Sequence, residues 1–224
     1  LYDDVALGPE AIAQLYNTYI GTHKPPVAHW DFEAGFTDTV HDVGYSVSGT
    51  TIASFDLPEF GQAADFDGVN DYITIDYDPR FDIKGSMAIA CWCYIHSFAS
   101  GNTILNYGGE PEAYSMVVTS SGELGFYREE EDGTNVYLTS SATLTTGTWN
   151  HLVVVDDGRL MRTYINGVED INTFSSLGQY QAGLSNNLDM YIGHEGSTAS
   201  EAVSVGDYFY GRISELTLWD TGLT

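Results

Sequence analysis

From Val27 onward, apolar and polar side chains alternate in short runs, which is the period of a β-strand rather than of a helix. The longest run, residues 87–95, predicts one strand with two distinct faces. One face carries Met87, Ile89, Cys91, Cys93 and Ile95, and the other carries Ala88, Ala90, Trp92 and Tyr94. We expect the first face to lie between two packed sheets. We expect the second on an outer surface, where its aromatic rings either pack against neighbouring strands or stack on sugar rings.

Similar runs predict strands at 29–32, 71–75, 102–107, 113–119, 123–127, 134–138, 149–155, 161–165, 188–192 and 208–219. Turn signals separate many of them: Asp67-Gly68, Ser121-Gly122, Asp132-Gly133, Asp157-Gly158 and Asn166-Gly167. Many short strands at this spacing are typical of a sandwich. We therefore predict an all-β fold of two antiparallel sheets.

The first 26 residues do not fit this pattern. Pro9 and Glu10 open a stretch in which Ile12, Leu15 and Tyr16 share one helical face, which predicts one short N-terminal helix. A linker over 18–26 follows. The predicted organisation is a separate segment 1–17, the linker, and one domain over 27–224.

Composition narrows the functional classes. With 43% hydrophobic residues the chain can build a core, so disorder is excluded. Seven Lys and Arg against 32 Asp and Glu give a net charge of −25, which repels nucleic acids and anionic membranes and attracts Ca²⁺. No apolar run approaches the roughly 18 residues of a membrane span. Cys91 and Cys93 are predicted to be small buried hydrophobes, because residues two apart on a strand cannot bridge without distortion.

Seven short motifs follow one another in a fixed order, at residues 30–32, 66–72, 91–93, 147–153, 164–167, 191–193 and 209–219. They include Trp30-Asp31-Phe32, Asn166-Gly167 and Tyr191-Ile192-Gly193. The order resembles the laminin-G-like, concanavalin-A-like jelly-roll family, with pentraxins as relatives, over roughly residues 27–224. The resemblance implies a jelly-roll sandwich but says little about the ligand, because one fold hosts many functions.

Residues 1–17 resemble the end of such a domain, the part that would come after Thr224. This resemblance implies one unit of a tandem array, preceded by the tail of another repeat, and a chance similarity is the alternative. The segment carries the apolar residues Leu1, Val5 and Leu7. We expect it either to fold back on its own module or to dock on a neighbouring copy, which would give self-association.

Calcium is the expected cofactor. The loop from Gly193 to Asp207 resembles the pentraxin calcium loop, which implies Glu195 and Asp207 as metal ligands, with Glu112 near a third ligand position. The resemblance is incomplete, because Gly196 and Ser197 stand where the family has another acidic residue. A solvated acidic surface is the alternative, and it is favoured for the run at 129–132. A second candidate calcium site lies near Asp65, Asp67, Asn70 and Asp71, with Asp31 or Glu33 as a further ligand. A purely structural turn is the alternative, and it is favoured here.

The candidate ligand contacts are Trp92, Tyr107 and Tyr114, expected as exposed aromatic rings beside the acidic loops. Trp149 is expected in the core, and His151 is interpreted as a strand residue without a catalytic role. No strand alternates carboxylates as glucanases on this fold do, and no Gly-x-Ser-x-Gly motif occurs, so we predict no enzymatic activity.

Together these features predict a non-catalytic module of a large secreted, cell-surface or virion protein, such as a bacterial adhesin or a phage fibre. Its expected partner is a glycan or a cell-surface protein, bound with the help of Ca²⁺. The alternatives are a repeat that spaces or assembles a fibre, and an accessory module of a carbohydrate-active enzyme.

Overall fold

The computed structural model of the chain describes residues 24–54, 61–98, 102–108, 113–130, 133–175, 189–196 and 208–222. The predicted N-terminal helix, the segment 1–17 and most of the linker lie outside these residues, as do Glu112 and Asp207. Within the described part of the chain, no helix is long and apolar enough to cross a membrane.

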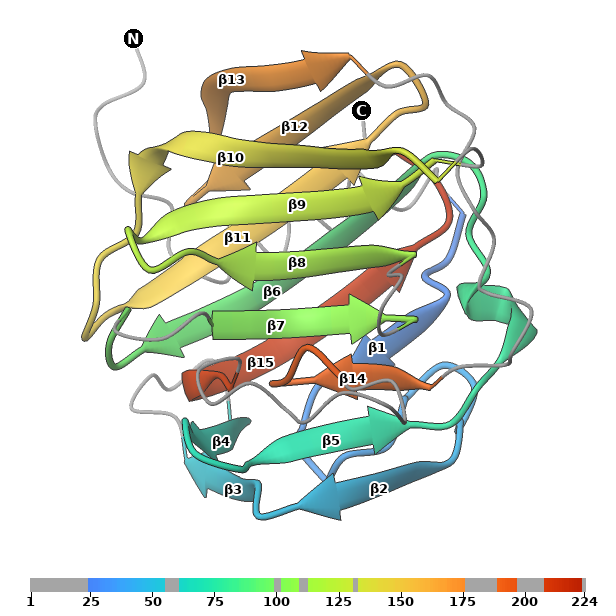
Figure 1. The fold of residues 1–224 in the computed structure, drawn as a ribbon. Coiled ribbons are helices and arrows are strands. Elements are labelled where there is room, and N and C mark those ends of the chain that lie inside the picture. The colour runs from blue at the N-terminus through green and yellow to red at the C-terminus, as the bar shows by residue number, and fades with distance from the viewer. Residues whose placement is uncertain are drawn as a thin grey trace, which may run out of the picture.

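Two antiparallel sheets pack face to face, as the alternation predicted (Figure 1). The eight-stranded sheet has the order β13-β12-β11-β6-β15-β4-β3, with β1 also paired to β15. Its strands are β1 (Ala28–Trp30), β3 (Thr51–Ser54), β4 (Gln62–Asp67), β6 (Met87–Ile95), β11 (Trp149–Asp156), β12 (Leu160–Ile165), β13 (Val168–Ser175) and β15 (Tyr210–Trp219).

The seven-stranded sheet has the order β10-β9-β8-β7-β14-β5-β2. Its strands are β2 (Tyr45–Ser48), β5 (Tyr72–Ile75), β7 (Asn102–Tyr107), β8 (Tyr114–Val118), β9 (Glu123–Glu129), β10 (Asn135–Thr143) and β14 (Met190–Ile192). A short 3₁₀ turn, η1 (Pro79–Phe81), leads from β5 towards β6. The all-β, two-sheet antiparallel fold class is thus confirmed.

The core lies between the sheets and contains the predicted inner face of β6. Met87, Ile89, Cys91, Cys93 and Ile95 are all buried there, and the two cysteines are free thiols. The opposite face of β6 is only partly exposed. Ala88 and Ala90 are buried in a second, smaller apolar cluster with Val155 and Trp219.

Four strands were not predicted, namely β2, β3, β4 and β13. Three of them, β2, β3 and β13, lie at the edges of the sheets and have mostly exposed side chains, so they lack the alternation that marks a half-buried strand. By contrast, the predicted hairpin at Asn166-Gly167 is confirmed. Both residues have positive φ, 53° and 79°, as a two-residue turn between β12 and β13 requires.

One end of the sandwich matters most for the site. There β6 and β14 end and β5, β11 and β15 begin, at the left of Figure 1. These strand termini carry Tyr94, Ile192, Tyr72, Trp149 and Tyr210. We call this the aromatic end.

Candidate functional site

Tyr107 and Tyr114 are not on the surface, and the expectation of exposure was wrong. Their exposed fractions are 1% and 0%, and their rings contact each other at 5.2 Å between centroids. The Tyr107 hydroxyl donates to Asp82 Oδ1 at 2.5 Å, and the Tyr114 hydroxyl donates to the Phe81 carbonyl oxygen at 3.1 Å. These buried phenols therefore link η1 to the seven-stranded sheet. The prediction that they contact a ligand assumed exposed rings, and neither ring is exposed.

The inward placement follows from register. Tyr107 pairs with Met190 and Tyr114, and Met190 points into the core. A bulge between Thr103 and Leu105 shifts the alternation of β7. Because one extra residue moves every later side chain to the other face, the face of Tyr107 is decided by that bulge.

Trp92, the third predicted contact, lies on the outer face of the eight-stranded sheet and is partly exposed. It is opposite His151 on β11, and the two rings are 5.0 Å apart between centroids. Burial lowers the pKa of His151 to about 4, so this imidazole is neutral at physiological pH. The interpretation of His151 as a strand residue is confirmed, since it lies within β11.

Four rings continue this surface towards the aromatic end, and we call them the aromatic row. Trp149 lies 5.6 Å from Tyr94, Tyr94 lies 5.3 Å from His96, and His96 lies 4.8 Å from Tyr210, all measured between ring centroids. His96 is exposed and Tyr210 is 41% exposed. The rings belong to three neighbouring strands and the residue after β6, so the row crosses the sheet.

Trp149 was expected in the core, and that expectation was wrong. Leu152 and Val154 on the same strand are buried, which places Trp149 on the opposite, outward face. It pairs with Tyr94, another outward residue. The signal was present in the sequence, because Trp149 is an odd number of residues from both apolar positions.

Two glycines allow close packing on either side of Tyr210 in the fold. A Cβ on Gly68 would lie 2.7 Å from the Tyr210 Cβ, and a Cβ on Gly211 would lie 2.0 Å from the Tyr94 carbonyl oxygen. Gly211 also has φ of +151°, which L side chains rarely adopt. Gly211 thus allows β15 to lie against the end of β6, and Gly68 leaves room for the Tyr210 side chain.

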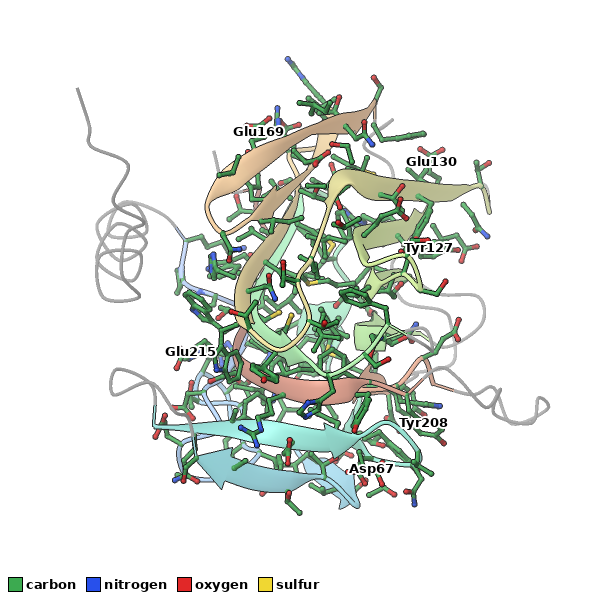
Figure 2. All side chains as sticks on the ribbon, turned by 90° about the vertical axis from the view of Figure 1, so that its left-hand side faces the viewer. Asp67, Tyr127, Glu130, Glu169, Tyr208 and Glu215 are labelled. Carbon is green, nitrogen blue, oxygen red and sulfur yellow. The ribbon has the colours of Figure 1, made fainter. Side chains whose placement is uncertain are left out.

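A second aromatic group lies beyond the end of β14, and we call it the His194 cluster. His194 stacks on Tyr208 at 4.4 Å between ring centroids and lies 5.4 Å from Tyr72 and 6.1 Å from Tyr191. The imidazole Nδ1 accepts a hydrogen bond from the Gly196 amide at 2.9 Å. Figure 2 looks onto the aromatic end and shows Tyr208 on the side of the seven-stranded sheet.

Of the three predicted metal ligands, only Glu195 is described, and its side chain is partly exposed next to the His194 cluster. Among the described residues, no three His, Cys, Asp or Glu side chains come together as a metal-binding group. Because Glu112 and Asp207 lie outside the described residues, calcium binding stays a prediction.

The acidic run at 129–132 was expected to be solvated, and this was wrong for its first two members. Glu129 and Glu130 are 5% and 6% exposed. Residues 131–132 lie outside the described part. Glu130 closes a tight turn, since its carbonyl accepts from the Gly133 amide and its own amide donates to the Thr134 carbonyl.

The acidic group around Asp67 is a structural turn, as predicted. Asp67 Oδ1 accepts from the amides of Val69 and Asn70, and Asp71 Oδ2 accepts from the Asp67 amide. Burial first, and then the charges of Asp67 and Asp65, raise the pKa of Asp71, although the Asp67 amide opposes this.

The sequence matches one known protein family. The family described as the concanavalin A-like lectin/glucanases superfamily matches residues 67–224. No curated protein sequence matches the chain.

Similar solved structures include the binding domain of Paraclostridial Mosquitocidal Protein 1, with a TM-score of 0.67 and 14% identity over 89% of this chain and 49% of that one. The binding domain of Botulinum Neurotoxin serotype G has a TM-score of 0.64 and 10% identity over 89% and 49%. This chain thus spans about half the length of the toxin domains.

A third similar structure is Domain 4 of AbnA, an extracellular GH43 arabinanase from Geobacillus stearothermophilus, in complex with arabinotriose. It has a TM-score of 0.60 and 20% identity over 89% of this chain and 94% of that one. At these identities the solved structures establish the fold alone. The family match covers most of the sequence, and the chain therefore belongs to the concanavalin A-like lectin/glucanases superfamily.

Proposed function

We propose that this chain is a non-catalytic carbohydrate-binding module of a secreted or surface-exposed protein, and that the aromatic row is its sugar-contacting surface. The observation that carries the proposal is the run of ring contacts from Trp149 through Tyr94 and His96 to the part-exposed Tyr210. Aromatic rings offer a large contact area at low entropic cost, and polar tips such as the Tyr210 hydroxyl can bond sugar hydroxyls.

The comparisons support a binding role. The toxin structures are named as binding domains, and the arabinanase domain is named as a complex with arabinotriose. That domain is matched over 94% of its length, which favours an accessory module of a carbohydrate-active enzyme as the parent context. An extracellular location is part of this proposal.

The lack of catalysis is supported by the outer face of the seven-stranded sheet. One cross-strand row of that face runs through Ser46, Thr74, Tyr191, Asn106, Ser115, Tyr127 and Tyr137, none of which is a carboxylate. On β9 the outward carboxylates Glu123 and Glu129 are about 20 Å apart at strand spacing. A glycosidase pair needs roughly 5–9.5 Å.

The test is a glycan microarray followed by calorimetric titration of the best neutral hit, with Tyr210→Ala and Trp149→Ala as site variants. Tyr137→Ala is the matched control, because Tyr137 is exposed to a similar extent, 45% against 41%, but lies on β10 of the other sheet. We expect dissociation constants on the order of 0.1–1 mM. Both site variants should weaken binding at least about tenfold, a loss of roughly 1.4 kcal/mol, and the control should not.

If Tyr137→Ala weakens binding as much as Tyr210→Ala, the sugar is not held by the aromatic row. If no glycan binds and the protein self-associates in sedimentation experiments, the proposal fails and the fibre-assembling repeat takes its place. A cell-surface protein partner would be indicated by cell binding that survives removal of surface glycans.

A further inference from the structure

The positive charges of the chain are distributed unevenly between the two ends of the sandwich. All seven Lys and Arg of the sequence lie among the described residues, so their positions can be compared completely. Arg212, two residues into β15, is the one at the aromatic end. The other six lie near η1, β1, the last residues of β9 and the β11–β12 turn, towards the opposite end (Figure 1).

The charge of Arg212 is balanced by a neighbouring carboxylate. Its Nε donates to Asp65 Oδ1 at 3.1 Å, and the two residues are direct cross-strand neighbours on β15 and β4. In the same register Arg212 is also opposite Tyr94, so the ion pair lies beside the aromatic row. Next to it, Tyr210 is paired with Asp67, which adds a carboxylate and no cation.

Recognition of acidic sugars needs a cationic side chain that is not already paired with a carboxylate. Carboxylates, sulfates and sialic acids are bound by unpaired Arg or Lys groups, with bidentate Arg the strongest donor. The net charge of −25 adds a long-range repulsion for any anionic ligand. Stacking of an uncharged pyranose or furanose ring on aromatic faces needs no cation.

We propose that the aromatic row selects uncharged saccharides and rejects acidic ones, and that the Arg212–Asp65 pair enforces this locally by keeping the one nearby cation neutralised. The inference rests on the proposed function of the row as a sugar-contacting surface. Arg212 and Asp65 are positioned to determine specificity beside the row rather than to hold the sugar ring.

The test uses an array in which neutral glycans are printed beside counterparts that differ by one sulfate or one sialic acid. At about 20 mM salt, where the Debye length is tens of ångströms, the acidic member of each bound pair should be at least about tenfold weaker. At about 500 mM salt the difference should narrow, because the long-range repulsion is screened.

Two matched variants locate the effect. Asp65→Asn removes the charge that neutralises Arg212 and should raise the acidic-to-neutral affinity ratio by about threefold or more, as expected for one surface charge contact. Asp157→Asn removes the same charge from Arg162, whose Nη1 lies 2.8 Å from Asp157 Oδ2 at the opposite end, and should leave the ratio near that of the unmodified protein.

Three results would overturn the inference. Equal binding of neutral and acidic members would refute charge selection while leaving the carbohydrate-binding function intact. An equal change of the ratio in both variants would show that net charge, not Arg212, sets the preference. Absence of binding to any glycan would remove the proposed function and this inference together.

Discussion

The guanidinium of Arg128 and the carboxylate of Asp156 form an ion pair across the interior of the sandwich, with Nη1 and Oδ2 3.2 Å apart and both side chains fully buried. Arg128 lies on β9 of one sheet, and Asp156 is the last residue of β11 in the other. The guanidinium also donates to the carbonyl oxygens of Gly85 and Ile83 at 2.7 and 2.6 Å. The pair thus joins both sheets to the segment between η1 and β6.

Replacing Asp156 by Ala should destabilise the protein by about 3–5 kcal/mol, because it leaves the buried charge of Arg128 without its counter-ion. Equilibrium unfolding in urea measures this. Arg162→Ala is the control, since its pair with Asp157 is partly exposed and should contribute about 1 kcal/mol or less. Similar losses in the two variants would mean that burial does not decide the strength of the pair.

Asp170 joins the two sheets at their outer edges. Its carboxylate accepts hydrogen bonds from the amides of Ser141, Ala142 and Asn172 and from the Ser141 hydroxyl, at 2.8 to 2.9 Å. Burial acts to raise the pKa of Asp170, but these hydrogen bonds outweigh it, and the pKa is lowered.

Asp170→Ala should therefore lower stability by about 2–3 kcal/mol and uncap edge amides of β10, which makes the variant prone to aggregate. Urea unfolding and light scattering during heating check the two effects. Asp170→Asn keeps one acceptor oxygen and should be intermediate. A fully stable Asp170→Ala protein would contradict a role for this residue in closing the sandwich.

His151 makes stability depend on pH in mildly acidic solution. Burial lowers its folded-state pKa to about 4, whereas an unfolded chain has about 6.5, so the unfolded state takes up the proton first. The stabilisation is complete above pH 6.5 and is lost as the pH falls towards 4. Between pH 7 and 5 the expected loss is about 2 kcal/mol.

The measurement is the urea midpoint between pH 7 and 5, a range above most carboxylate titrations, for the natural protein and for His151→Gln. The variant should show a flatter pH dependence. An NMR titration that gives His151 an ordinary pKa near 6.5 would refute the assignment.

Calcium is tested at constant ionic strength, because a chain of charge −25 is stabilised by any added salt. In about 0.5 M NaCl, Ca²⁺ should still raise the melting temperature relative to EDTA, since a ligand selective for the folded state stabilises it. Glu195→Gln with Asp207→Asn should abolish the shift. An identical melting temperature with Ca²⁺ and with EDTA would contradict specific Ca²⁺ binding and leave only the general screening of surface charges by salt.

The sequence alone determined the fold class and the two faces of its most regular strand. Alternation in residues 87–95 correctly predicted which side chains of this strand face the core. The prediction is reliable because a strand projects successive side chains to opposite sides whatever its neighbours are. The Asn166-Gly167 turn was equally local, since it depends on the φ values those two residues tolerate. Edge strands such as β13 were not predicted, because their side chains are mostly exposed and so show no alternation of apolar and polar residues.

Only the tertiary structure decided which face is covered and which distant residues meet. A bulge in β7 turned Tyr107 inward, although a tyrosine suits core or surface equally well. The aromatic row brings together residues from positions 94 to 210, and the Arg212–Asp65 pair spans 147 positions. Local alternation defines two sides of a strand, but register between strands far apart in sequence sets which side chains become neighbours.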